Sequence, residues 1–171
     1  MIAVGHSSVG VLVGVAVLSV ARPATPVWIL VALALILAVI SHYVCDFVPH
    51  GHYYIDNKKL TARSIGTLFV DFIGGVVLLL ALATRKYGVG PELLVVAAGM
   101  LGALAPDMFE SSIKLKLIPK TAMVKREMAF HGAMHWHDEP TSPLPHGARP
   151  IRWTDLWQLA MLAAAIYVLI F

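Results

Sequence analysis

Residues that could bind a metal ion gather in one short segment, His-Tyr-Val-Cys-Asp-Phe-Val-Pro-His-Gly-His, over residues 42–52. His42 and Asp46 are four residues apart, so on a helix their side chains would lie on one face, about one turn apart. Imidazole nitrogens and carboxylate oxygens are common zinc ligands, and this pair could hold one ion or hydrogen-bond to each other. Pro49 would end the helix, and Gly51 would let the chain turn back. The segment therefore predicts a polar, metal-binding site.

The turn would bring His50 or His52 toward the same point. The alternative is a helix end at a membrane interface, where polar side chains are tolerated and histidines only meet lipid headgroups. That alternative explains one isolated histidine better than it explains His42, Asp46 and His52 together. We therefore expect these three residues to be the primary metal ligands, with His50 supporting them or contacting substrate.

The composition indicates an integral membrane protein. Of 171 residues, 58% are hydrophobic and 13% are charged, and the mean hydropathy is +0.78. Soluble domains are about 45–50% apolar and about 25% charged, so a soluble class is excluded. The single cysteine, Cys45, excludes an internal disulfide and a cysteine-based zinc cluster. We expect one all-α membrane domain over residues 1–171.

Five apolar runs have the length of roughly 20 residues that a helix needs to cross about 30 Å of hydrocarbon. They lie at residues 2–21, 27–48, 64–84, 91–109 and 153–171. The first run is expected to stay in the mature protein, because no lysine or arginine precedes it and it is longer than the apolar region of a signal peptide. The sequence thus predicts a five-helix bundle with a long loop, residues 110–152, between its fourth and fifth helices.

Lysines and arginines predict the orientation of these spans. Of the 13 such residues, ten fall on the face shared by the N-terminus and the loops after the second and fourth spans, and three on the other face. Positive loops stay cytoplasmic, so we expect a cytoplasmic N-terminus and an outside C-terminus, in a bacterial or archaeal cytoplasmic membrane. All eight histidines fall at or near the cytoplasmic face. The excess of lysine and arginine then reflects the orientation of the spans. We expect the lipid bilayer, rather than nucleic acid, to be the partner.

Two carboxylates are predicted inside the spans, at the depth of the histidine segment. Asp71 lies about seven residues into the third span, and Asp107 lies near the end of the fourth. An unpaired intramembrane carboxylate costs at least several kcal/mol, so each needs a partner. Asp107 is a candidate ligand and catalytic carboxylate, or else part of a helix-ending turn. Asp71 could orient a ligand histidine, or bond to serine or backbone across a helix interface.

His6, inside the first span, reaches the same level and is a further candidate ligand. The long loop adds His131 and His135, which have the four-residue spacing that could grip a metal if this stretch is helical. His135 and Glu139 share that spacing, whereas His137 would point elsewhere. We expect the last two residues to support the site or to contact substrate.

Lys125 and Arg126 in the same loop could attract a lipid phosphate, although the cytoplasmic location of the loop explains them equally well.

The segment His42-Tyr43-x-x-Asp46-x5-His52 resembles the His-Tyr-x-x-Asp-x5-His segment of the zinc-dependent phospholipase C and S1/P1 nuclease superfamily, including the proline before the second histidine. In that superfamily the first histidine and the aspartate bind zinc, the aspartate bridges two ions, and the second histidine serves a further zinc. The resemblance implies these roles for His42, Asp46 and His52.

The chain is also similar to bacterial inner-membrane metal-dependent hydrolases that have been related to that superfamily. The similarity lies in an N-terminal helix with a histidine, a Gly-Ala-Leu-x-Pro-Asp segment (102–107), a His-x3-His segment (131–135) and a Ser-His-x3-Asp segment (41–46). Here the last segment precedes the other two, whereas in that family it follows them. The resemblance implies a membrane-bound hydrolase of this type.

We therefore expect two or three zinc ions at the cytoplasmic end of the bundle, acting on a phosphoester of a phospholipid or another lipid-linked substrate, with Asp46 and Asp107 as catalytic carboxylates. A membrane di-iron oxygenase of the desaturase or hydroxylase type is an alternative, and it would need iron. A metal or proton transporter is another, in which Asp71, Asp107 and His42 would line a path. A small structural membrane protein is the simplest alternative.

Overall fold

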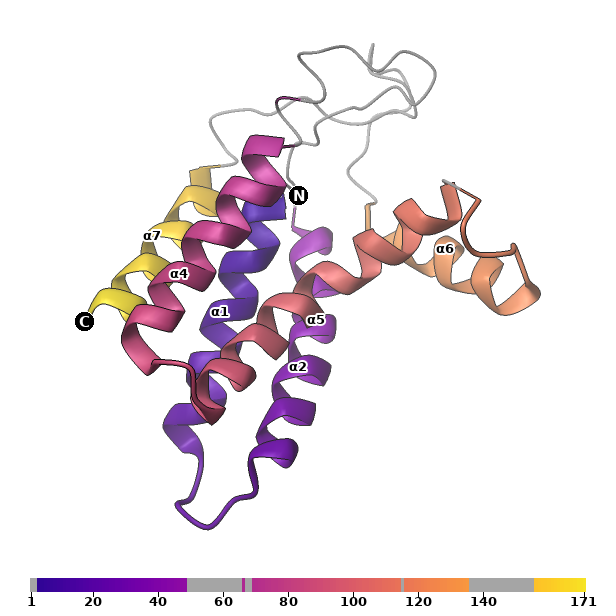
Figure 1. The fold of residues 1–171 in the computed structure, drawn as a ribbon. Coiled ribbons are helices and arrows are strands. Elements are labelled where there is room, and N and C mark those ends of the chain that lie inside the picture. Colours follow the sequence, from indigo (N-terminus) through magenta and orange to yellow (C-terminus); the bar gives the residue numbers. More distant parts are fainter. Residues whose placement is uncertain (1–2, 49–65, 67–68, 115, 136–155) are drawn as a thin grey trace.

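A computed structural model gives the fold, and it describes residues 3–48, 66, 69–114, 116–135 and 156–171 (Figure 1). These residues form helices and turns and no strand, which confirms the all-α prediction. In chain order the helices are α1 (Ala3–Val20), α2 (Val27–Phe47), the π-helical turn η1 (Phe69–Gly74), α4 (Gly75–Tyr87), α5 (Pro91–Lys114), α6 (Ala122–Met134) and α7 (Trp157–Ile170).

Three of the helices, α1, α2 and α5, are long and apolar enough to cross a membrane. Their apolar stretches are 18, 21 and 23 residues long, which corresponds to about 27–35 Å at 1.5 Å per residue. The apolar helix α7 is shorter, with 14 residues. The third and fifth predicted spans both begin outside the described residues, so the number of five spans remains a prediction.

Short connections arrange the helices as antiparallel neighbours. The segment 21–26 reverses the chain between α1 and α2, so the start of α1 and the end of α2 lie at the same end of the bundle (Figure 1). Helix α4 ends at Gly88, which adopts a left-handed φ of 68° and donates its N–H to the carbonyl of Thr84. Helix α5 follows at once with Pro91 in its first position. Residues near positions 6 and 42–46 thereby become neighbours.

Helix α5 lies between α1 and α2 and contacts both through glycines. A Cβ atom on Gly99 would overlap the carbonyl oxygen of Gly10, and one on Gly14 would lie 2.7 Å from the Cα of Val96. On the other side, a Cβ on Gly102 would lie 2.5 Å from the carbonyl oxygen of Leu35. The three backbones therefore touch directly, as small residues allow between membrane helices.

An apolar core fills the half of the bundle formed by α1, α4, α5 and α7. Its buried members include Val11 of α1, Leu79 of α4, Val96 of α5 and Leu169 of α7. The outer face of α2, by contrast, exposes large apolar side chains: Leu33, Leu35, Ile36, Leu37, Ile40, Val44 and Phe47. An apolar exposed face of this length is what a lipid-facing helix requires.

The region predicted as a loop differs from the prediction in its first part. Helix α5 does not end near residue 109 but continues through Pro106 to Lys114. After a short turn, α6 begins at Ala122, and the side-chain oxygen of the preceding Thr121 accepts a hydrogen bond from the backbone N–H of Val124. In Figure 1, α5 extends beyond the bundle and α6 folds back beside its end. Residues 131–135 are thereby returned to the end of α2.

Candidate metal centre

Six of the predicted ligands converge at the end of the bundle where α1 starts and α2 ends. Their nitrogen and oxygen atoms form groups whose members lie within 4.8 Å of one another. One group is His6, His42, Asp46 and Asp107, and a second is Asp46, His131 and His135. Four helices therefore contribute to one centre, although its residues are up to 129 positions apart in the chain.

The fully buried carboxylate of Asp46 lies in the middle of the centre. Its Oδ2 is 2.9 Å from Nε2 of His42, 3.0 Å from Nε2 of His131 and 3.4 Å from Nε2 of His135. Its Oδ1 is 3.3 Å from Nε2 of His6. The i,i+4 relationship predicted between His42 and Asp46 is present on α2. Four imidazoles thus face one carboxylate.

The orientation of His42 is fixed from behind. Its Nδ1 lies 2.7 Å from the backbone carbonyl oxygen of Ala103, and a carbonyl only accepts, so Nδ1 carries the proton. In a neutral ring, Nε2 then carries a lone pair and points at the oxygen of Asp46, and it also lies 3.3 Å from Nε2 of His131. Lone pairs that face each other repel, so this arrangement requires a proton or a metal cation among these atoms.

His6 and Asp107 form the side of the centre nearest the open edge. His6 is fully buried and stacks on His42 with 4.0 Å between ring centroids. Among the described residues neither ring nitrogen of His6 makes a hydrogen bond, although its Nε2 is 3.6 Å from Oδ2 of Asp107. The side chain of Asp107 is 39% exposed, in contrast to that of Asp46. Asp107 is therefore the carboxylate that solvent or a substrate can reach.

Helix α6 supplies the two remaining histidines. Burial lowers the pKa of His135 to about 4, so its imidazole is neutral at pH 7, the form that binds metals. Burial also disfavours the charged form of His131. The hydrogen bond to Asp46 and the charge of Asp107 together outweigh that effect, however, and raise the pKa of His131.

Asp71 lies in η1, away from these imidazoles. Its Oδ2 accepts the N–H of Ala3 at 2.8 Å, and its Oδ1 accepts the N–H of Val4 at 3.0 Å. The carboxylate therefore caps the start of α1, where the helix dipole also favours negative charge. Asp71 therefore bonds to backbone, which is one of the roles expected for it. Among the described residues it does not contact a ligand histidine. Its hydrogen bonds tie it to α1, the helix that carries His6.

The other predicted residues divide into two sets. Lys125 and Arg126 are exposed on α6. The remaining four, His50, His52, His137 and Glu139, lie outside the described residues, so their assignment remains a prediction.

Sequence reasoning missed two glutamates. Glu110 lies one helical turn after Asp107 and forms a third possible ligand group with Asp107 and His131. Glu127 lies one turn before His131, with its Oε1 4.0 Å from Nδ1 of that residue. Both are at i,i+3 or i,i+4 spacing from a predicted ligand, a signal that would have been informative had residues 110–134 been expected to be helical.

The donor set fits a transition metal. It combines imidazole nitrogens with carboxylate oxygens, which zinc accepts and iron also accepts. The buried Nε2 of His6 lacks a hydrogen bond within the described part of the chain, and the Nε2 of His42 cannot donate when the ring is neutral. A cation would satisfy both atoms. Asp46 belongs to two of the groups, so it could bridge two ions.

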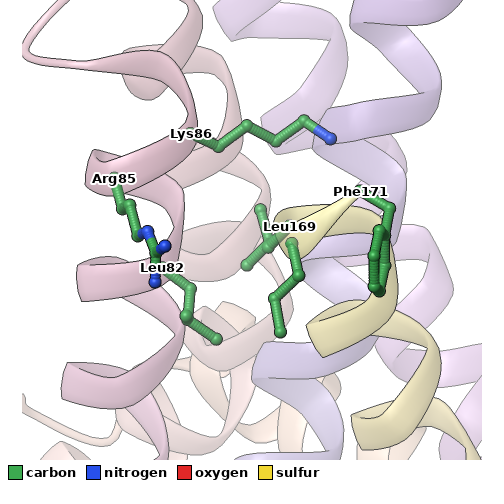
Figure 2. A pocket seen from close by; sticks show the side chains of 6 residues that line it. Leu82, Arg85, Lys86, Leu169 and Phe171 are labelled. Carbon is green, nitrogen blue, oxygen red and sulfur yellow. The ribbon is translucent and has the colours of Figure 1, made fainter.

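A cavity of about 270 Å³ lies elsewhere, between α4 and the end of α7 (Figure 2). It is lined by Leu82, Arg85, Lys86, Leu169, Ile170 and Phe171. Lys86 donates from Nζ to the carbonyl of Val168 at the C-terminal end of α7, an arrangement that the helix dipole favours. None of these lining residues has a histidine or carboxylate side chain, so the cavity does not contain the metal-binding groups.

Comparisons with protein families, with curated proteins and with solved structures find no match for this chain.

Proposed function

We propose that this chain is a membrane-embedded metal-dependent hydrolase, with zinc as its metal, that cleaves a phosphoester in a lipid or lipid-linked substrate. One observation carries the proposal: Nε2 of His42 is held 2.9 Å from the carboxylate of Asp46 while Nδ1 is committed to the carbonyl of Ala103. Metal-binding histidines commonly donate their other ring N–H to a carbonyl or carboxylate in this way.

The bound metal would supply Lewis-acid polarisation of a phosphoryl oxygen and make water acidic enough to attack near neutral pH. The residues of the chain divide the remaining work according to burial. His6, His42, His131 and His135 hold the centre together, and Asp46, buried among them, links its two groups. Asp107, which is partly exposed, is the carboxylate placed to accept a proton from attacking water at the open edge.

The sequence resemblance to zinc-dependent phospholipases C supports the same chemistry. His42 and Asp46 are the first histidine and the aspartate of that pattern, and they are close enough to share an ion. The proposal assigns His52 to a further zinc, as the pattern implies. The segments 41–46, 102–107 and 131–135 also resemble those of bacterial inner-membrane metal-dependent hydrolases.

A lipid substrate is favoured by the surroundings of the centre. Helix α6 and the turn before it expose the apolar side chains of Leu117, Met123 and Phe130. The same segment exposes Lys116, Lys120, Lys125 and Arg126. Apolar and basic side chains together suit the surface of an anionic bilayer. With the proposed cytoplasmic N-terminus, the centre would open at headgroup depth on the cytoplasmic side.

A transporter is less well supported than a hydrolase. The buried polar residues of α1, α2 and α6 gather at one end, whereas the core of α1, α4, α5 and α7 is apolar. An ion path would need polar groups along that core.

Metal analysis of the detergent-purified protein tests the proposal. We expect at least one equivalent of zinc in the wild type and a large loss in His42→Ala and Asp46→Ala. Glu92→Gln, which removes a carboxylate in the first turn of α5 at the other end of that helix, should retain the wild-type content. Less than one equivalent of any transition metal in the wild type would defeat the proposal, and iron in place of zinc would favour the di-iron oxygenase.

Hydrolysis is then measured on phospholipid vesicles, with release of a phosphorylated headgroup or of phosphate as the readout. The zinc-loaded wild type should release it, and Asp107→Asn should release much less while retaining zinc.

A further inference from the structure

Two buried polar atoms beside the centre lack hydrogen bonds and are chemically complementary. They are Nδ1 of His131 and Oε2 of Glu127, and neither has a hydrogen-bond partner among the described residues. The two side chains are one turn apart on α6, with Oε1 of Glu127 4.0 Å from Nδ1 of His131. A small rotation of either side chain would bring them to hydrogen-bond distance.

The two nitrogens of His131 have different surroundings. Nε2 faces the centre, 3.0 Å from Asp46 and 3.3 Å from Nε2 of His42. If Nε2 binds a metal, the neutral ring carries its proton on Nδ1, which then needs an acceptor because it is buried. The carboxylate of Glu127 is the acceptor in reach.

Tyr43 anchors this carboxylate to α2. Its hydroxyl donates to Oε1 of Glu127 at 3.1 Å, and its ring meets the rings of Phe130 and His131 edge-on, with centroids 5.0 and 5.6 Å apart. Tyr43 follows His42 directly in α2. The helix that carries the primary ligands therefore also positions Glu127, the partner of His131.

We propose that Glu127 and Tyr43 are positioning residues that fix the ring of His131 for metal binding. Tyr43 orients the carboxylate, the carboxylate accepts the Nδ1 proton, and Nε2 is thereby directed into the centre. His42 receives the same support from the carbonyl of Ala103. A carboxylate that accepts the Nδ1 proton raises the basicity of the imidazole more than a carbonyl acceptor does. His131 would therefore bind a metal ion more tightly with Glu127 as its partner than with a carbonyl.

This inference rests on the proposed function in one respect, because it takes Nε2 of His131 to be a metal ligand. Neither Glu127 nor Tyr43 contacts the reacting atoms, so both act through His131. The effect of their loss should therefore be seen in metal affinity first.

Chelator competition on the full-length protein in detergent tests the proposal with zinc as the probe. Removal of such a supporting partner typically weakens metal binding about 10- to 100-fold, and we expect a loss in that range for Glu127→Ala. Glu127→Gln should lose less, because its amide oxygen still accepts the Nδ1 proton. Tyr43→Phe, which removes only the hydroxyl, should lose least, and the remote Glu92→Gln should equal the wild type.

Nuclear magnetic resonance of protein with ¹⁵N-labelled histidine supplies a readout that a purely structural role would not move. The Nδ1–H proton of His131 should resonate far downfield in the wild type, shift in Glu127→Gln and disappear in Glu127→Ala. Circular dichroism shows whether each variant is folded and so separates this effect from misfolding. Glu127→Gln serves as the conservative replacement.

Wild-type zinc affinity in a folded Glu127→Ala variant would overturn the proposal. So would an Nδ1–H signal that does not respond to Glu127→Gln or Glu127→Ala. If the wild type binds no zinc, the proposed function fails, and the Nδ1–H signal still decides whether Glu127 holds His131.

Discussion

Nδ1 of His42 donates its proton to the backbone carbonyl of Ala103, 2.7 Å away on α5. A main-chain atom therefore sets the rotation of the ligand ring, and no side-chain change on α5 can remove it directly. Pro106 follows three residues later and lacks the N–H that would bond to the carbonyl of Gly102. The primary ligand of α2 is thus oriented by the stretch of α5 in which Pro106 leaves the helix without one backbone hydrogen bond.

Loss of the cap on α1 should weaken both folding and metal binding. Asp71→Ala removes the acceptors of the Ala3 and Val4 amides and should lower the free energy of unfolding by about 1 kcal/mol. Asp71→Asn keeps one oxygen and should lose less. Because His6 lies in the first turns of the same helix, zinc affinity should fall in the same order. Thermal unfolding and chelator competition measure the two effects, and equal stability of all three proteins would contradict the capping role.

The contact between α1 and α5 should not tolerate a side chain. Gly99→Ala would force its Cβ against the carbonyl of Gly10 and should cost several kcal/mol or prevent folding, since neither backbone can yield without separating the helices. Gly74→Ala is the matched control, because a Cβ there meets nothing within 4 Å. Yield and thermal unfolding in detergent compare the two variants. Similar behaviour of both would show that the close approach is not required.

Removal of His6 should cost more metal affinity than removal of a supporting residue. His6→Ala deletes a nitrogen within 3.6 Å of both carboxylates, so zinc binding should weaken by more than the roughly 10- to 100-fold expected when a supporting partner is lost. Chelator competition compares the zinc affinity of His6→Ala with that of His146→Ala, which changes a histidine that is not predicted to be a ligand. Unchanged affinity in His6→Ala would remove α1 from the centre.

Chelation should loosen α6 while leaving the bundle intact. The closest contacts of α6 with α2 include those of Glu127 and His131 with Tyr43, His42 and Asp46, so the metal would hold this helix in place. Hydrogen exchange with and without EDTA should show faster exchange over residues 122–134 and little change over the part of α5 that packs on α1. Equal protection of α6 in both states would mean that the metal does not hold it.

Charge on α6 should matter for substrates in an anionic membrane. Each basic residue near such a surface contributes about 1 kcal/mol, so Lys125→Gln and Arg126→Gln should each weaken binding of an anionic phospholipid to the protein roughly fivefold at low salt. Titration of the detergent-solubilised protein with anionic and with neutral lipid measures the effect, and raised salt should reduce it. Weaker binding of neutral lipid as well would indicate a structural defect instead.

Local spacing was enough to predict the pair on α2. His42 and Asp46 had to share a helix face if residues 42–46 were helical. The apolar composition of the segment predicted that helix. His6 and Asp107 needed one further step, because only alternating topology assigns them the same depth. These relationships depend on helix periodicity and on span order, which a sequence contains.

Other features depend on contacts that a sequence does not contain. Asp71 has one carboxylate and several possible partners at its depth, and the choice of the α1 amides follows from where η1 meets α1. Glu127 was missed because its segment has little apolar periodicity and was predicted to be a loop. Its helix is stabilised by the Thr121 cap and by packing of Val124, effects of local and tertiary contact.

The contact of Gly10 with Gly99 fixes the angular setting of α1 as well as its separation from α5. One residue inserted between His6 and Gly10 would leave that contact intact and swing His6 about 100° around the helix axis, out of the centre. Substitutions among the exposed apolar side chains of α2 should leave the position of His6 unchanged. The register of the main chain along α1 therefore determines whether His6 reaches the centre.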